Sequence, residues 1–500
     1  MKYDFSMNLA ALGEENLRKY GEYPSLAFEG RESTNVDQQR AANRLANGLR
    51  RMGIGPGDRV VVMLPNCPEV TQAYAAILKL GAVIVPVIFL LNPEEVRYIL
   101  ADAGAKLAVT SPDLAWKLEG WTGPIVAVGG AAGAMAYHEV VAREPDTFAM
   151  VDRADNDLAV ILYTSGTTGR PKGVALSHDN LASNARAAAS LYELDRNEWA
   201  LAVLPLSHSY GLTLMNVGNV LGTRGVLLRW FNPELVLEAI QRYRVQTMSG
   251  VPTMFVYLLN FPGAERFDTS SVKVWGSGAA PLPLEIVEPF ERKFGGLLLE
   301  GYGLTEASPV VSAHRLSGVR KLGSVGQPLP GVEVRVFDDD DRELPTGEAG
   351  EVCVRGRNVM AGYHGMPEET ARTVRNGWLH TGDVGRLDGD GFLYIVERKK
   401  DLIIRGGFNI YPREVEEALS AHPSVAEAAV VGMRDPLMGE EVLAFVVLKS
   451  GAEATAEAMI GFCQERLAKY KCPREVRFVE SLPKNPVGKI LRKDLRALAG

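Results

Sequence analysis

The sequence predicts an α/β protein: a large amino-terminal domain of layered α/β subdomains with a small β-rich subdomain, followed by a small α+β carboxy-terminal domain. Three observations predict this class: the length of 500 residues, an alternation of strands and helices up to about residue 310, and a change of pattern after about residue 323. A single core rarely grows to this length, so two or more domains are expected. Strand–helix alternation is typical of layers built on mostly parallel sheets.

The alternation begins near the amino terminus. A helix is expected over 37–52, because Leu45, Leu49 and Met52 fall on one helical face. Asn92, directly before a proline, is a typical helix cap. Buried strands are expected at 60–64, 82–87, 105–110, 201–205, 225–228, 247–250 and 272–276, with a further helix at 69–80.

The pattern after residue 323 is richer in strands and turns. The acidic run at 338–341 is interpreted as a solvated hairpin turn, because the glutamate that an EF-hand loop needs is missing. The boundary between the domains is expected at Arg398–Asp401, which gives domains 1–399 and 400–500 with Lys400 between them. Strands are expected at 332–338, 350–354, 391–396, 427–432 and 441–448, and helices at 412–420 and 456–469.

The composition is that of an ordinary globular protein, with 46% hydrophobic and 23% charged residues. The net charge of −7 disfavours a general nucleic-acid partner. Four cysteines without a C-x-x-C pair and seven scattered histidines disfavour structural zinc and a disulfide framework, which favours a cytoplasmic location. The amino terminus lacks the apolar run of a signal peptide, and no transmembrane segment is expected.

The stretch YTSGTTGRPKG at 163–173 predicts a loop that binds polyphosphate. Glycines allow backbone N–H groups to approach a ligand closely, and hydroxyls and cations complete an anion site. The loop is not a Walker A motif, because Lys172 is followed by glycine and the glycine spacing differs. The residues expected to contact the nucleotide are Thr164, Ser165, Gly166, Thr167, Thr168, Gly169 and Lys172.

Three further motifs carry chemistry. EGYGLTEASP at 300–309 offers a stacking ring at Tyr302, a hydroxyl at Thr305 and a hard carboxylate oxygen for Mg²⁺ at Glu306. HTGD at 380–383 offers Asp383, whose carboxylate could accept hydrogen bonds from two hydroxyls at once. GSGAAPLP at 276–283 would present its backbone to a flat ligand. Taken singly, each motif is also compatible with a structural turn.

These motifs resemble, in their order, those of the adenylate-forming (ANL) superfamily, in its acyl-CoA synthetase and fatty-acid–CoA ligase branch, over residues 30–498. The resemblance implies that a carboxylic acid and ATP give acyl-AMP and pyrophosphate, and that CoA then gives acyl-CoA and AMP. It implies ATP, Mg²⁺, coenzyme A and a small-molecule carboxylic acid as ligands. The oligomeric state stays open.

The resemblance also implies roles for individual residues. Tyr302 stacks on adenine, Thr305 contacts phosphate, and Thr164 and Glu306 hold Mg²⁺. Asp383 and Arg398 bind the ribose, and Arg398 also reaches phosphate. The adenine side is expected to comprise Gly278, Ala279, Ala280, Glu300, Gly301 and Gly303.

A mobile carboxy-terminal domain is implied in the same way. Lys400 occupies the hinge position, and Gly406 and Gly407 correspond to the loop that lines the pantetheine tunnel. Lys489 falls at the position of the adenylation lysine, which acts only before the small domain turns. Residues 466–496 hold ten cations and three acids, so 10 − 3 gives a local charge of +7, which suits phosphate ligands.

The acid is expected to be a medium- or long-chain fatty acid. His208 in LPLSHSYGL occupies the position that gates the acyl tunnel, and Gly301 stands where malonate-specific relatives place an arginine. Three alternatives remain: an aryl-CoA ligase of the coumarate or benzoate type, a ligase that loads a carrier protein from acyl-AMP, and a non-catalytic nucleotide-binding protein. The last is disfavoured because Lys489, Glu306 and Asp383 are all present.

Overall fold

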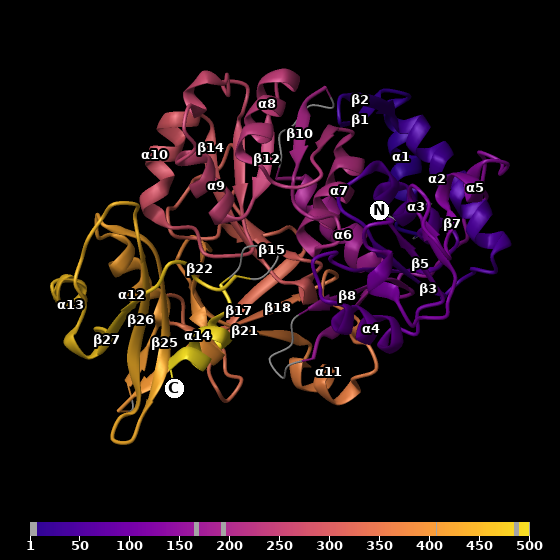
Figure 1. The fold of residues 1–500 in the computed structure, drawn as a ribbon. Helices are drawn as coiled ribbons and strands as arrows, with labels where there is room; N and C mark the ends of the chain where they lie inside the picture. The colour runs from indigo at the N-terminus through magenta and orange to yellow at the C-terminus, as the bar shows by residue number, and fades with distance from the viewer. Residues whose placement is uncertain (1–7, 165–169, 192–196, 407, 485–489, 500) are drawn as a thin grey trace.

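The computed structural model describes residues 8–164, 170–191, 197–406, 408–484 and 490–499, and its chain is traced in Figure 1. The described part of the amino-terminal domain contains two large sheets. In the nine-stranded sheet the strands follow one another in space as β16 (Gln327–Pro328), β15 (Val310–Ala313), β14 (Leu297–Gly303), β13 (Val274–Ser277), β12 (Thr247–Gly250), β10 (Trp199–Ala202), β11 (Arg224–Leu227), β1 (Pro24–Phe28) and β2 (Arg31–Thr34).

The eight-stranded sheet is mixed, with a parallel centre and an antiparallel hairpin at one side. Its spatial order is β19 (Gly362–Tyr363), β9 (Lys172–Ser177), β8 (Leu158–Thr164), β4 (Val83–Pro86), β3 (Arg59–Met63), β5 (Leu107–Thr110), β6 (Ile125–Ala127) and β7 (Met135–Ala136). The parallel pairs in both large sheets confirm the prediction of mostly parallel layers.

Two smaller sheets complete the described chain. The β-rich subdomain contains β17 (Val332–Phe337), β18 (Gly350–Gly356), β21 (Trp378–Leu387) and β20 (Val374–Arg375), with β22 (Leu393–Arg398) beside β21. The carboxy-terminal domain, yellow in Figure 1, contains β24 (Phe408–Ile410), β23 (Ile403–Arg405), β26 (Gly439–Leu448) and β25 (Val425–Asp435), with β27 (Glu475–Phe478) beside β26.

Helices cover these sheets, and several begin at the caps that the sequence indicates. Thr34 and Asp37 form a reciprocal capping box, as do Asn92 and Glu95, which satisfies backbone N–H groups that the helix leaves unpaired. The helices are α1 (Ala11–Tyr20), α2 (Asn35–Arg51), α3 (Pro68–Lys79), α4 (Pro93–Asp102), α5 (Tyr137–Val141), α6 (His178–Ala189), α7 (Ser209–Leu221), α8 (Pro233–Tyr243), α9 (Pro252–Leu259), α10 (Leu284–Phe294), α11 (Pro367–Thr373), α12 (Pro412–Ser420), α13 (Ala456–Gln464) and α14 (Arg492–Ala499).

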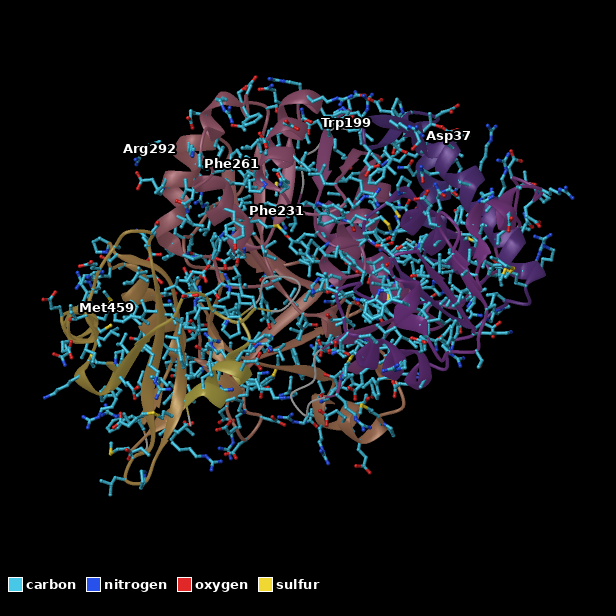
Figure 2. The ribbon with its side chains drawn as sticks, viewed as in Figure 1. Asp37, Trp199, Phe231, Phe261, Arg292 and Met459 are labelled. Atoms are coloured by element: carbon cyan, nitrogen blue, oxygen red, sulfur yellow. The ribbon has the colours of Figure 1, made fainter. Side chains whose placement is uncertain are left out.

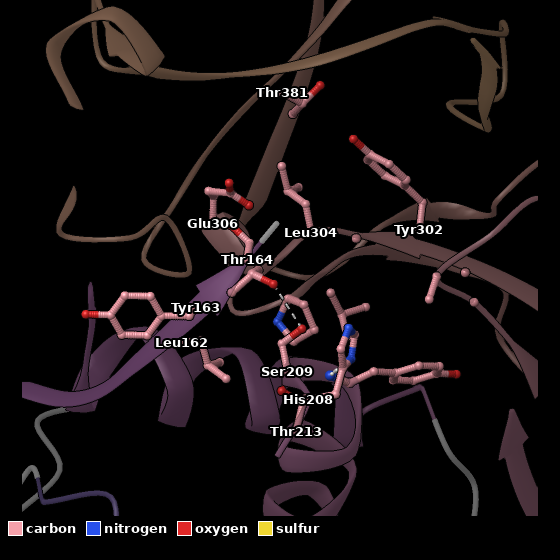
Figure 3. Close-up of a pocket in the computed structure, with 18 of the residues that line it drawn as sticks. Leu162, Tyr163, Thr164, His208, Ser209, Thr213, Tyr302, Leu304, Glu306 and Thr381 are labelled. Carbon is pink, nitrogen blue, oxygen red and sulfur yellow. Dashed lines mark hydrogen bonds between the residues drawn. The ribbon is translucent and has the colours of Figure 1, made fainter. Parts of the chain in front are cut away.

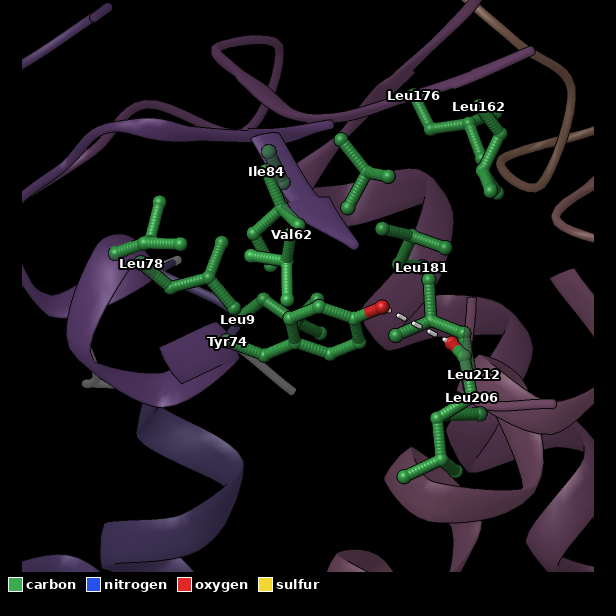
Figure 4. Packing of buried hydrophobic residues seen from close by; sticks show 14 of the residues in the cluster. Leu9, Val62, Tyr74, Leu78, Ile84, Leu162, Leu176, Leu181, Leu206 and Leu212 are labelled. Carbon is green, nitrogen blue, oxygen red and sulfur yellow. Dashed lines mark hydrogen bonds between the residues drawn. The ribbon is translucent and has the colours of Figure 1, made fainter. Parts of the chain in front are cut away.

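Apolar packing joins the two large sheets into one platform. Figure 4 shows Tyr74 of α3 between Val62 and Ile84 of one sheet and Leu206, which lies before α7. The Tyr74 hydroxyl donates a 3.2 Å hydrogen bond to the Leu206 carbonyl, so the buried phenol is satisfied. The two residues are 132 positions apart in the sequence. Their hydrogen bond holds the segment before α7 against α3, which packs on the eight-stranded sheet.

A second cluster holds β13 beneath α9 and α10. The Trp275 ring is fully buried and meets Phe290 edge-on at 5.1 Å between ring centroids. The smaller carboxy-terminal domain has its own core, which includes Met459, labelled in Figure 2. Each of these cores is large enough to hold the adjoining strand ends in place.

Several predicted elements have different bounds in the structure, among them two strands and a helix. The strand expected at 201–205 lies at Trp199–Ala202, because Pro205 has no N–H to donate to a sheet. The helix expected at 456–469 ends at Gln464, where the chain turns toward β27. The strand expected at 391–396 begins at Leu393, after the turn. No helix of the described chain is long and apolar enough to span a membrane.

Candidate active site

One cavity of about 990 Å³ lies where the large sheets, the β-rich subdomain and the carboxy-terminal domain meet. Figure 3 shows part of its wall, with His208, Ser209 and Thr213 on one side and Glu306 and Thr381 on the other. The predicted site residues that line it are Thr164, Lys172, His208, Gly278, Ala279, Glu300, Gly301, Tyr302, Gly303, Thr305, Glu306, Arg398 and Lys400.

Three of the predicted residues that the structure describes do not line the cavity. Asp383 lies behind its wall, where Tyr302 and Arg398 contact it. Ala280 and Gly406 are outside the lining. The predictions for Ser165, Gly166, Thr167, Thr168, Gly169, Gly407 and Lys489 fall outside the described residues.

The side of the cavity that is predicted to bind the nucleoside is built from two strands that meet at a carboxylate. The Tyr302 hydroxyl donates a 2.6 Å hydrogen bond to Oδ2 of Asp383. Nε of Arg398 lies 3.0 Å from the other oxygen, Oδ1, and Asp383 is only 3% exposed. The charge of Asp383 raises the pKa of Arg398, and burial together with Asp383 raises the pKa of Tyr302. Asp383 therefore lies within strand β21, and the alternative of a simple turn residue is wrong.

An irregularity in β21 produces this placement. Glu351 of β18 pairs with Val384, and Cys353 pairs with His380, so the step covers two residues of β18 and four of β21. The two additional residues of β21 change the direction in which its side chains point, as β-bulges commonly do near active sites. Gly382, in the irregular stretch, has a φ of +70°, which favours glycine.

The side that is predicted to bind phosphate begins at the end of β8. Thr164 pairs with Lys172 across the β8–β9 hairpin. The ammonium group of Lys172 forms an ion pair with Glu369 of α11 and lies 5.2 Å from the centroid of the Tyr363 ring. The cation thus faces the cavity beside a carboxylate of its own chain.

The donor set near the phosphate side fits Mg²⁺. Glu306 lies in the 3-10 helix Thr305–Ala307, and its Oε1 accepts a 2.9 Å hydrogen bond from the Tyr363 hydroxyl. Thr164 and Glu306 line the same cavity with the oxygen atoms that Mg²⁺ prefers. In the part of the chain that the structure describes, no cluster of three or more potential metal ligands exists. Phosphate oxygens and water would therefore supply most of the coordination.

The side that is predicted to bind adenine is shaped by glycines and an unusual backbone. A Cβ at Gly278 would lie 3.2 Å from Cε1 of Tyr210, so a larger residue would press on that ring. Ala279 has a φ of +68°, which turns the chain sharply after β13. Burial raises the pKa of Glu300 to about 7, and its Oε1 accepts a 3.1 Å hydrogen bond from the backbone N–H of Leu282.

At the opposite end, the described lining residues that α7 contributes carry no charge: Ser209, Tyr210, Thr213, Leu214 and Val217. His208 caps α7, with Nδ1 accepting a 3.2 Å hydrogen bond from the Tyr210 backbone. A hydroxyl pair connects Ser209 and Thr305 at 3.2 Å. The apolar part of this wall is formed by Ala188, Leu191, Leu214, Val217 and Val310.

Sequence reasoning missed Tyr210, which lines this end of the cavity, and Ser249, which lies behind it on the neighbouring strand β12. A Cβ at Gly276 would lie 2.8 Å from Oγ of Ser249 and 3.6 Å from the Tyr210 hydroxyl. Tyr210 therefore lies across the strand that carries Gly276. Its position two residues after His208 was the available signal, because both side chains belong to the start of one helix.

The carboxy-terminal domain closes the cavity. Lys484 and Leu491, on either side of a segment outside the described residues, both line it. Glu397 of β22 accepts a 2.8 Å hydrogen bond from the backbone N–H of Arg413 in α12. Gly406 instead contacts Met438, through a 2.8 Å backbone hydrogen bond. In this arrangement Lys484 and Leu491 are at the cavity and Gly406 is outside its lining.

The fold and the cavity define an enzyme that activates a carboxylic acid with a nucleotide. The family model described as AMP-binding enzyme matches residues 13–364, and the AMP-binding enzyme C-terminal domain matches residues 414–489. A long-chain-fatty-acid–CoA ligase of Bacillus subtilis (strain 168) is 38% identical over 97% of this chain and 94% of that protein. A feruloyl-CoA synthase of Amycolatopsis sp is also 38% identical, over 93% of this chain and 94% of that protein.

Solved structures agree with these matches. ATP-bound MatB from Rhodopseudomonas palustris superposes with a TM-score of 0.91 at 33% identity, covering 99% of each chain. The anthranilate CoA ligase AuaEII in complex with anthranoyl-AMP superposes with a TM-score of 0.94 at 28% identity, covering 99% of this chain and 98% of that one. The chain belongs to the AMP-binding enzyme family, and it is an ATP-dependent, AMP-forming acyl-CoA synthetase.

Proposed function

We propose that the acid is an apolar monocarboxylic acid, with a medium- or long-chain fatty acid as the principal substrate. The observation that carries this proposal is the absence of charge among the described lining residues of α7, which include Leu214 and Val217 beside His208. An unpaired second charge buried against such a wall would be costly, which disfavours dicarboxylates and amino acids. The long-chain ligase of Bacillus subtilis, at 38% identity, supports the same class.

An aryl acid is the second candidate, favoured by the floor of the cavity. The hydroxyl group of Tyr210 lies near Gly276, and both residues line the cavity. A compact acid with a polar group at its far end could hydrogen-bond to this floor, whereas an alkyl chain could not. The feruloyl-CoA synthase of Amycolatopsis sp supports this candidate.

In the proposed mechanism, the cavity residues position ATP and the acid for attack of the carboxylate on the α-phosphate. Tyr302, Asp383 and Arg398 hold the nucleoside, and Lys172 binds phosphate oxygens. When bound, Mg²⁺ would offset charge on the phosphates from a position beside Thr164 and Glu306. Preorganised charge of this kind supplies most of the rate enhancement in phosphoryl chemistry.

The second half-reaction requires a different orientation of the small domain. We place the hinge at Lys400, in the 3-10 helix Lys399–Asp401 that joins the domains 1–399 and 400–500. Burial and the nearby charge of Arg398 lower the pKa of Lys400. Rotation there would move Lys489 away and bring Gly406 and Gly407 to the cavity, so that the CoA thiol can attack the acyl carbonyl. Gly406 lies outside the cavity lining in the present arrangement, which supports a need for rotation.

The protein is proposed to act in the cytoplasm on small molecules, without a nucleic-acid partner. All four cysteines are buried free thiols, which is compatible with a reducing compartment. The net charge of −7 provides no general attraction for nucleic acid.

An acid panel tests the substrate proposal. Pyrophosphate release should be measured with saturated acids of increasing length, coumarate, benzoate, malonate and amino acids, each with and without CoA. Each methylene that enters the apolar tunnel should add ~0.8 kcal/mol, so kcat/KM should rise with chain length and then reach a plateau. Malonate or an amino acid as the best substrate would overturn the proposal. A rate with a phosphopantetheinyl carrier protein above the rate with CoA would identify a carrier-loading ligase instead.

A further inference from the structure

The residue directly before the proposed hinge is anchored to the large domain by two carboxylates. Nζ of Lys399 lies 2.7 Å from Oδ1 of Asp339 and 3.4 Å from Oε2 of Glu351. Asp339 belongs to the acidic turn between β17 and β18, which the sequence alone placed in solvent. That turn therefore reaches across the β-rich subdomain to the start of the hinge.

Glu351 also contacts the nucleoside side of the cavity. Its Oε1 accepts a 3.1 Å hydrogen bond from the backbone N–H of Gly382, the residue before Asp383. Its Oε2 lies 3.4 Å from Nδ1 of His380. The carboxylate is 9% exposed, and it occupies the gap that the irregularity of β21 opens beside β18. One side chain thus contacts both the Gly382 backbone beside Asp383 and the lysine before the hinge.

We propose that Glu351 is a positioning residue that fixes the backbone beside Asp383 with one oxygen and the stationary side of the hinge with the other. The inference rests on the proposed rotation at Lys400. Glu351 and Lys399 both precede Lys400, so their contact stays with the large domain when the small domain turns. A buried carboxylate is retained where each oxygen has a partner, because an unpartnered one is costly.

Because the two carboxylate oxygens of Glu351 have different partners, two substitutions of this residue should have different effects. Glu351→Gln keeps an oxygen that can accept from Gly382 but removes the charge that faces Lys399. It should lower kcat of the complete reaction by ~3- to 10-fold and change the KM for ATP by less than about twofold. Glu351→Ala removes both contacts, so it should also raise the KM for ATP by ~10-fold.

Lys399→Met provides an independent variant, because its side chain is 45% exposed and its loss should not prevent folding. It should lower kcat as Glu351→Gln does, and the double variant should be no slower than either single one. Glu333→Gln is the matched control, since Glu333 forms a surface ion pair with Arg355 on the same sheet and should leave both parameters unchanged.

Additive effects of Glu351→Gln and Lys399→Met would overturn the coupling, as would equal KM increases in the Gln and Ala variants. Either outcome would leave the acyl-CoA synthetase activity of the wild-type protein intact. Failure of the rotation itself would appear separately: substitutions at Lys400 would then change the rates of the two half-reactions by the same factor.

Discussion

The Tyr302 hydroxyl and the Asp383 carboxylate, 81 residues apart in the sequence, are joined by a 2.6 Å hydrogen bond at the nucleoside side of the cavity. The bond connects β14 of a large sheet to β21 of the β-rich subdomain. Arg398 engages the other carboxylate oxygen, so Asp383 is held from two sides before nucleotide binds. We infer that this preorganisation reduces the cost of ordering the site when ATP enters.

Tyr302→Phe tests that preorganisation. The variant keeps the ring that is expected to stack on adenine but leaves the buried carboxylate without one donor. The loss should raise the KM for ATP by ~10-fold, measured by steady-state pyrophosphate release. Tyr394→Phe is the control, because the Tyr394 hydroxyl faces Asp388 at 3.4 Å, away from the cavity. Equal KM values for wild type and Tyr302→Phe would show that the hydrogen bond does not contribute to binding.

Glu300 predicts a specific pH dependence of stability. Its folded pKa is about 7 and its ordinary value is 4.5, because burial disfavours the charged form. Between these values the folded state binds more protons than the unfolded state, so the free energy of unfolding falls as pH rises from 4.5 through 7. The shift corresponds to roughly 3 kcal/mol at most.

Glu300→Gln should remove this contribution. Urea unfolding of both proteins between pH 4.5 and pH 8 should show the variant gaining stability relative to wild type as pH rises. A constant difference between the two proteins across that range would exclude Glu300 as the titrating group.

Glu369 is predicted to weaken ATP binding. In the described structure it pairs with Lys172, so its carboxylate competes with phosphate oxygens for that cation. Glu369→Gln should lower the KM for ATP by ~2- to 5-fold, with little change for the acid. The neighbouring Glu368→Gln is a matched control, since its side chain is 90% exposed. An increase in the KM for ATP would instead give Glu369 a direct role in nucleotide binding.

Lys400→Pro tests the hinge. Proline fixes φ near −65°, so the backbone could not take a second conformation at this residue. The second half-reaction should slow more than the first, and acyl-AMP should accumulate in rapid-quench experiments without matching thioester. If both half-reactions keep their wild-type rates, the rotation occurs at another residue.

Local sequence signals predicted much of the fold, while the site depended on contacts between distant segments. The cap at Asn92 and the helix over 412–420 follow from neighbouring residues, and both are confirmed. Glycine-rich motifs located Tyr302 and Lys172 because a short loop contains its own chemistry. The partners of these residues could not be found that way, since Glu369 follows Lys172 by 197 positions.

Asp383 and Glu351 illustrate what sequence patterns omit. Asp383 was compatible with a turn, and only the irregular register of β21 against β18 shows it as a buried strand residue. Glu351 lies in an ordinary-looking strand, and its two contacts depend on how three strands meet. Tyr210 was missed for a related reason, because its role depends on the strand that carries Gly276.

The two half-reactions of Lys489→Ala test the central claim that one chain adenylates an acid and then transfers it to CoA in a second orientation. Adenylation should be measured as pyrophosphate release. Thioester formation should be measured separately, after CoA is added to supplied acyl-AMP. Loss of a charged contact made in the transition state should slow adenylation by ~10²- to 10³-fold and leave thioester formation near the wild-type rate. Equal loss in both half-reactions would contradict the account.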